Sequence, residues 1–304
     1  MPAFRTALFA LSLLALTGCG NLQALKVAAP PEAAHGRAME LGRQPAANVT
    51  VAPNAFPIGE GTIVSQTGGG SLAAGLLFGP VGALANSASI SAESERVRKA
   101  VDPASVAAIH PAAELAAAWK EAGLPERADG QGAKVESFVI FYLDNARENV
   151  YALPGLRVTG TGLKSADGKS EWVGHYLFAI EQTLPPQRLN EALPAQDLAA
   201  VSATVRAAYR ELLKEVALDL RPGAAPARKL ANIHAPVLKA TTMGFAGFTA
   251  GDIEQGPDGR LSIRVSIDNY GPAMTRANPY FVWVFPSKKQ YTFEIGPEER
   301  RAAR

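Results

Sequence analysis

Cys19 is the only cysteine among the 304 residues of this chain, and it lies near the N-terminus in the stretch LTGCG. A thiolate can act as a nucleophile or bind a metal, and two thiols can form a disulfide. A disulfide within the chain needs a second cysteine, and a free thiol is a liability in an oxidising compartment. Covalent modification of the Cys19 sulfur therefore best explains a single cysteine at this position.

The residues before Cys19 have the layout of a secretory signal. Arg5 supplies one positive charge, an apolar run extends from Ala7 to Leu16, and two small residues follow it. The run is too short to cross the hydrocarbon core of a bilayer, which is about 30 Å thick. Residues 16–19, Leu-Thr-Gly-Cys, resemble the lipobox of bacterial lipoproteins. The resemblance covers only this signal and cleavage site.

This resemblance implies that residues 1–18 are removed and that the Cys19 sulfur is diacylated, so that the mature chain has no thiol. Two or three acyl chains hold a protein firmly in a membrane, whereas one gives only marginal binding. Gly20 stands where Asp would signal retention in the inner membrane. The resemblance thus implies the periplasmic side of the outer membrane in a two-membrane bacterium. The alternative is an ordinary signal peptide with a chance cysteine.

The charge balance argues against a nucleic-acid partner. The chain has 30 basic and 28 acidic residues, and removal of residues 1–18 deletes only Arg5 from this count. A near-neutral chain offers no excess of cations for counterion release from nucleic acid, and no polybasic grip on lipid headgroups. We therefore expect no nucleic-acid binding, and we expect membrane contact through the lipid anchor alone.

No catalytic or metal-binding motif is readable in the sequence. The histidines at positions 35, 110, 175 and 234 are far apart, and the HExxH, G-x-S-x-G, S-x-x-K and P-loop patterns do not occur. We expect no metal and no cofactor. Enzymatic activity remains uncertain, because a site can assemble from distant residues. His175 shares a predicted strand face with Val173 and Leu177, which favours a hydrogen-bonded core histidine over a ligand.

The aromatic residues near the C-terminus are the first candidate for binding. With Pro286 to Lys289 as a hairpin loop, Tyr280, Val282 and Val284 would face a strand that contains Tyr291, Phe293 and Ile295. The opposite face would carry Phe281, Trp283 and Phe285. These three aromatics form either a second buried layer or an exposed groove for a ligand, glycan or partner.

A repeated spacing gives the second candidate. Asp144 and Asn145 end one predicted strand, and Arg147, Asn149 and Tyr151 follow as R-x-N-x-Y. Asp268 and Asn269 end another, and Arg276, Asn278 and Tyr280 repeat this spacing. Two copies would present Asp, Asn and Arg at one end of a sheet. The alternative is coincidence, because Asp and Asn favour turns through their own local hydrogen bonds.

Composition divides the chain into five segments. Residues 1–18 are the signal peptide, 19–47 the lipidated cysteine and a flexible Ala/Pro-rich tether, and 48–90 an apolar segment rich in glycine. Residues 91–297 form the domain, and 298–304 are a charged tail. The glycine-rich segment has three interpretations: a phosphate-binding loop after TIVSQ, a small-residue face on Gly75, Gly79 and Gly82 for a partner helix or bilayer, or an apolar hairpin packed on the domain.

Strands and helices occur in runs, which predicts an α+β fold with a mostly antiparallel sheet of about six to eight strands and two or more helices. Apolar residues on both faces of 134–145 predict a central strand, and a turn at Asp167 and Gly168 would place Lys164 opposite Glu171. Residues 194–220 have the stripe of an amphipathic helix. Residues 261–268 alternate apolar and polar, which predicts that the face with Ser262 and Arg264 meets water.

The preferred function is a lipid-anchored, non-catalytic lipoprotein of the cell envelope that binds a protein, lipid or peptidoglycan partner. The firm anchor and the predicted tether motivate this interpretation. One alternative is a lipid- or ligand-binding accessory of an envelope transport system. The other is an envelope hydrolase whose site cannot be read from the sequence.

Overall fold

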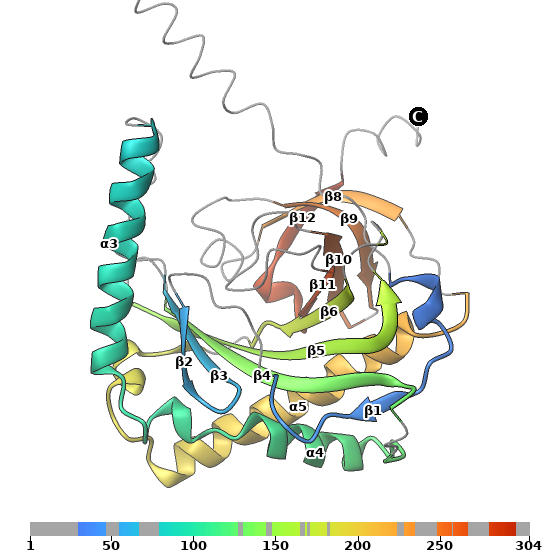
Figure 1. Cartoon of the computed structure of the whole chain (residues 1–304), viewed down its shortest axis with the longest axis horizontal. Helices are drawn as coiled ribbons and strands as arrows, with labels where there is room; N and C mark the ends of the chain where they lie inside the picture. The colour runs from blue at the N-terminus through green and yellow to red at the C-terminus, as the bar shows by residue number, and fades with distance from the viewer. Residues whose placement is uncertain are drawn as a thin grey trace, which may run out of the picture.

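A computed structural model describes residues 30–46, 55–66, 79–126, 130–143, 148–164, 168, 171–180, 183–223, 228–234, 248–256, 258–266 and 280–295. Within these ranges, twelve strands join in one sheet, and the helices α4 and α5 lie together across one of its faces (Figure 1). The α+β prediction is confirmed.

The sheet is mixed and larger than expected. Its order is β12-β8-β9-β10-β11-β6-β5-β4-β3-β2, with β1 on β4 and β7 on β5. Most pairings are antiparallel, but β1 and β3 run parallel to β4, and β11 runs parallel to β6. The strands are β1 Met39–Leu41, β2 Ala55–Gly59, β3 Thr62–Gln66, β4 Ala133–Leu143, β5 Val150–Lys164, β6 Glu171–Phe178, β7 Thr183–Leu184, β8 Arg228–His234, β9 Phe248–Gln255, β10 Leu261–Ser266, β11 Tyr280–Phe285 and β12 Thr292–Ile295.

Two helices cover the sheet and a third stands at its edge. α4 (Pro111–Glu121) begins at a proline. Proline suits the first helical position because an N–H there would have no acceptor within the helix, so its absence costs no hydrogen bond. α5 (Ala195–Asp219) buries the predicted stripe at Val205, Ala208, Leu212 and Val216. α3 (Gly79–Ala100) stands beside β2, and its Ser94 Oγ accepts a buried hydrogen bond from Gln66 Nε2 of β3 at 2.8 Å (Figure 1). None of the described helices is long and apolar enough to cross a membrane.

The main core lies between these helices and the sheet. Trp119 and Leu115 of α4 and Tyr209 of α5 pack against alternate residues of the strands, such as Val139 and Val282. The opposite face of the sheet is also apolar at its centre, where the Phe138 ring lies over Gly155. A Cβ at Gly155 would lie 2.2 Å from Phe138 Cζ, so this close approach requires glycine.

The prediction of a tether that continues to residue 47 is wrong for residues 30–46. Glu32–Ala34 form a short 3-10 helix, and β1 pairs with β4. Ala34 is fully buried and Ala46 is nearly so. The sequence misled because a three-residue strand shows no periodicity of its own, and its partner lies about ninety positions further along the chain.

The glycine-rich segment, residues 48–90, contains strands and part of a helix in its described parts. TIVSQ is β3, which pairs with β2 and with β4, and Gly79 and Gly82 lie in α3. The other glycines of the proposed phosphate loop and helix face, from Gly68 to Gly75, lie outside the described residues.

The predicted C-terminal hairpin is wrong, whereas the predicted pairing of Lys164 with Glu171 is confirmed. β11 lies between β10 and β6, and β12 pairs with β8 at the far edge of the sheet. Between them Ser287 and Gln290 form a capping box on a 3-10 turn, Lys288–Gln290, in place of a hairpin loop. The period of a strand shows which side chains share a face, but it does not identify the neighbouring strand.

Candidate functional site

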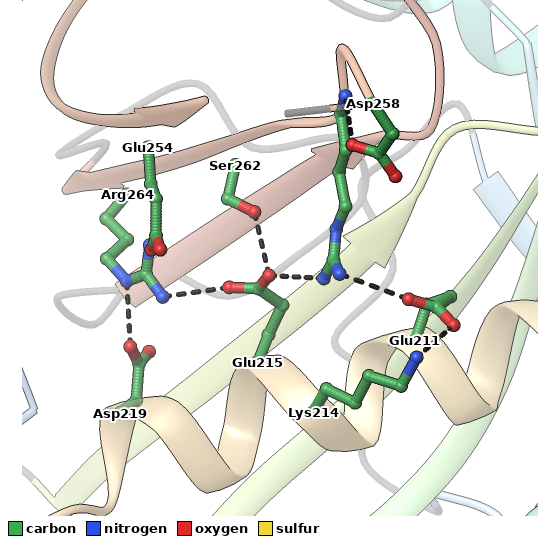
Figure 2. Close-up of polar contacts among 9 residues, drawn as sticks. Glu211, Lys214, Glu215, Asp219, Glu254, Asp258, Ser262 and Arg264 are labelled. Atoms are coloured by element: carbon green, nitrogen blue, oxygen red, sulfur yellow. Dashed lines mark hydrogen bonds and ion pairs between the residues drawn. The ribbon is translucent and has the colours of Figure 1, made fainter. Parts of the chain in front are cut away.

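The most concentrated group of charges lies between α5 and β10 (Figure 2). Glu211, Glu215 and Asp219 are four residues apart on α5 and therefore share one face of the helix. Arg260 precedes β10, and Ser262 and Arg264 alternate along it toward this helix face. We call this group the α5–β10 cluster.

Arg264 bridges the two carboxylates at the centre of the α5–β10 cluster. Its Nε lies 2.7 Å from Asp219 Oδ1, and its Nη2 lies 2.8 Å from Glu215 Oε2. Glu215 Oε1 accepts a hydrogen bond from Ser262 Oγ at 2.8 Å and another from Arg260 Nη2. Glu215 is 2% exposed, Asp219 5% and Arg264 6%, so the pairs are removed from water.

Two tyrosines also donate hydrogen bonds to Asp219. The hydroxyls of Tyr176 on β6 and Tyr280 on β11 donate to Asp219 Oδ2 at 3.0 Å and 2.5 Å. Burial, together with the negative charge of Asp219, raises the pKa of Tyr176 well above its usual value. Burial alone would lower the pKa of Arg264, but Asp219, Tyr280 and Glu215 outweigh it and raise that pKa. The guanidinium therefore stays charged and the Tyr176 hydroxyl stays protonated.

The prediction that the polar face of residues 261–268 meets water is wrong for Ser262 and Arg264. This face meets the carboxylates of α5, and both residues are buried. Each carboxylate oxygen of Glu215 and Asp219 accepts at least one hydrogen bond from the sheet. Such a saturated cluster braces the helix against three strands, β6, β10 and β11, because its groups are already paired with one another. The sequence signal was the acidic residues spaced by four beside the apolar stripe of α5.

An open cleft on the other face of the sheet presents charged groups to solvent. Its volume is about 500 Å³, and it is lined by Arg43, Gln44, Pro45, Lys134, Glu136, Arg157 and Thr159. Lys134 and Glu136 lie opposite Thr159 and Arg157 in the antiparallel register of β4 and β5. The 43–45 segment runs beside β4, since Gly42 N donates to Val135 O and Ala46 N to Ser137 O. We call this site the Arg157 cleft.

Glu136 holds two of the cations in the Arg157 cleft. Its Oε1 lies 2.6 Å from Lys134 Nζ, and its Oε2 lies 3.2 Å from Arg157 Nη1. Arg43 at the rim is exposed and lies 3.8 Å from the exposed Glu126. One carboxylate thus pairs with two cations of the cleft, and positive charge remains in excess.

Across the strands β5, β6 and β11, the residues in register with Arg157 are a histidine and then a phenylalanine. Arg157 pairs in register with His175, and His175 pairs with Phe281. The His175 ring is buried, stacks on Phe281 at 5.2 Å and meets the edge of Phe138 at 6.4 Å. Burial first, and then the positive charge of Arg157, lower the pKa of His175 to about 3. The predicted core position of His175 is confirmed, and the imidazole is neutral. The predicted hydrogen bonding is not borne out at Nδ1, which is buried without a hydrogen-bond partner among the described residues.

The three aromatics proposed as a binding surface are buried. Phe281 and Phe285 are 0% exposed and Trp283 is 2% exposed, and the Trp283 and Phe285 rings stack. The exposed-groove alternative is therefore wrong, and the buried-layer alternative is confirmed. The strand expected beside them, β12, pairs with β8 instead.

The remaining predicted site residues are not brought together by the part of the chain that the structure describes. Cys19, Asp144, Asn145, Arg147, Asp268, Asn269 and Arg276 all lie outside it. Among the described residues, no group of three or more histidine, cysteine, aspartate or glutamate side chains could hold a metal ion. The sequence matches no protein-family model and no curated protein.

Proposed function

We propose that this chain is a lipid-anchored lipoprotein of the cell envelope that binds a partner through the Arg157 cleft without catalysing a reaction. The lipobox-like residues 16–19 support the anchor at Cys19. By the same resemblance, the fold would face the periplasm from the outer membrane.

One observation carries the binding role: the charged residues of the fold are divided between two faces of the sheet. On the helix face, the centre of the α5–β10 cluster is buried and its charges are paired with one another. On the other face, the Arg157 cleft is open and has more cations than carboxylates. A rigid, internally braced sheet that presents an accessible polar cleft suits recognition of a partner.

In-cell photocrosslinking from Gln44 tests this proposal. Gln44 is exposed and lines the cleft, so a photoreactive residue in its place should give a discrete adduct in cells that express the full chain. The matched control carries the same residue at Lys120, which is exposed on α4 and lies outside the cleft. The proposal fails if position 44 gives no adduct, or if both positions give the same one.

A further inference from the structure

We infer that the Arg157 cleft binds a phosphoryl group. This inference rests on the proposed binding function and names the chemistry of its ligand. The cleft offers guanidinium groups from Arg43 and Arg157 and an ammonium group from Lys134. Arginine forks match the oxygens of phosphate in a bidentate manner, and lysine adds a point charge.

The two cations that pair with Glu136 are positioned before a ligand arrives. Arg157 extends from β5 within the sheet, and its side chain is only 21% exposed. Glu136, which is 9% exposed at its side chain, fixes one edge of this guanidinium and also holds Lys134. A phosphoryl group has several acceptor oxygens and a charge near −2 at neutral pH, so it can bridge both cations in competition with Glu136.

The neighbouring residues favour an anion over a cation or an apolar ligand. Gln44 and Thr159 add polar groups to the lining, and Pro45 is its one residue without a polar side chain. The source of the phosphoryl group is either free phosphate or a lipid headgroup, since the contact chemistry is the same for both.

Calorimetric titration of the full chain in detergent micelles tests the inference. One arm adds inorganic phosphate, and the other compares micelles doped with phosphatidic acid with micelles doped with phosphatidylcholine. Saturable binding of inorganic phosphate supports a free anion, and binding of phosphatidic acid alone supports a headgroup. No saturable binding in either arm overturns the inference. If position 44 still gives its crosslink in cells, the proposed function nevertheless stands.

Substitutions distinguish binding in the cleft from a general effect of the protein's charge on phosphate affinity. R157Q and K134Q should each weaken binding by roughly tenfold or more, because each removes a charge-assisted hydrogen bond. The matched control R96Q removes an exposed arginine of α3 and should change affinity less than about twofold. Equal weakening in R96Q and R157Q would overturn the inference.

E136Q provides a test in the opposite direction. Removal of this carboxylate frees Lys134 and Arg157 from their present partner. Phosphate affinity should therefore rise by roughly threefold or more. A folded E136Q protein, checked by far-UV circular dichroism, that binds phosphate no better than wild type would contradict the inference, even if R157Q fails to fold.

Discussion

Replacement of Arg264 with methionine is expected to lower the free energy of unfolding by about 3–5 kcal/mol, because two buried carboxylates lose their shared cation. Arg264 is 6% exposed and bonds both Glu215 and Asp219. Methionine fills much of the same volume but leaves both charges without this partner. Urea unfolding of the full chain at neutral pH, with an unchanged slope, measures the loss.

The control for this prediction is Arg210→Met. Arg210 pairs with Glu121 at 3.0 Å, but both side chains are at least 40% exposed. Its loss should therefore cost less than about 1 kcal/mol. In a double-mutant cycle, Glu215→Met should cost less in the Arg264→Met background than in the wild type. A loss for Arg264→Met no larger than that for Arg210→Met would show that the α5–β10 cluster does not brace the fold.

Acidification from about pH 7 to about pH 5 is expected to cost about 2 kcal/mol of stability through His175 alone. The pKa of His175 falls from 6.5 to about 3 on folding, mainly through burial and then through the charge of Arg157. Above the unfolded pKa the imidazole is neutral in both states and contributes no difference. Below the unfolded pKa, His175 binds a proton in the unfolded state but not in the folded state. Stability therefore falls until the pH nears the folded pKa.

His175→Leu should flatten this part of the stability profile. The variant replaces the ring that lies between Phe138 and Phe281, so its stability at neutral pH can differ from that of the wild type. The relevant measurement is the difference in unfolding free energy between the two pH values. A control variant, His110→Leu, removes an exposed histidine and should keep the wild-type difference. An unchanged pH dependence in His175→Leu would contradict the prediction.

Elements with a strong local pattern could be predicted from the sequence. α5 begins and ends within one residue of its predicted bounds, because its apolar stripe recurs with the helical period over about five turns. β4 was recognisable as a central strand because both of its faces are apolar. The pairing of Lys164 with Glu171 followed from a short turn between adjacent strands.

The features that depend on distant partners could not be predicted in this way. The alternating pattern of residues 280–285 predicts a strand, but it does not identify the neighbours of that strand. These are β6 and β10, and not the residues that follow in the chain. The polar face of β10 resembled a solvated face because the buried carboxylates that bind it lie on a helix 45 or more positions earlier. The Arg157 cleft combines residues 43–45, which the composition predicts to be part of a tether, with the strands β4 and β5. No local motif in the sequence marks such a site.

The central claim is that a lipid on Cys19 anchors this chain, and the Cys19→Ser variant tests it most directly. Intact-mass measurement of the wild-type protein from the envelope fraction should give a chain that begins at Cys19 and has two or three acyl chains. The variant should lack the acyl mass and leave the membrane fraction. Wild-type protein without acyl mass, or a Cys19→Ser variant that sediments with the envelope as before, would contradict the claim.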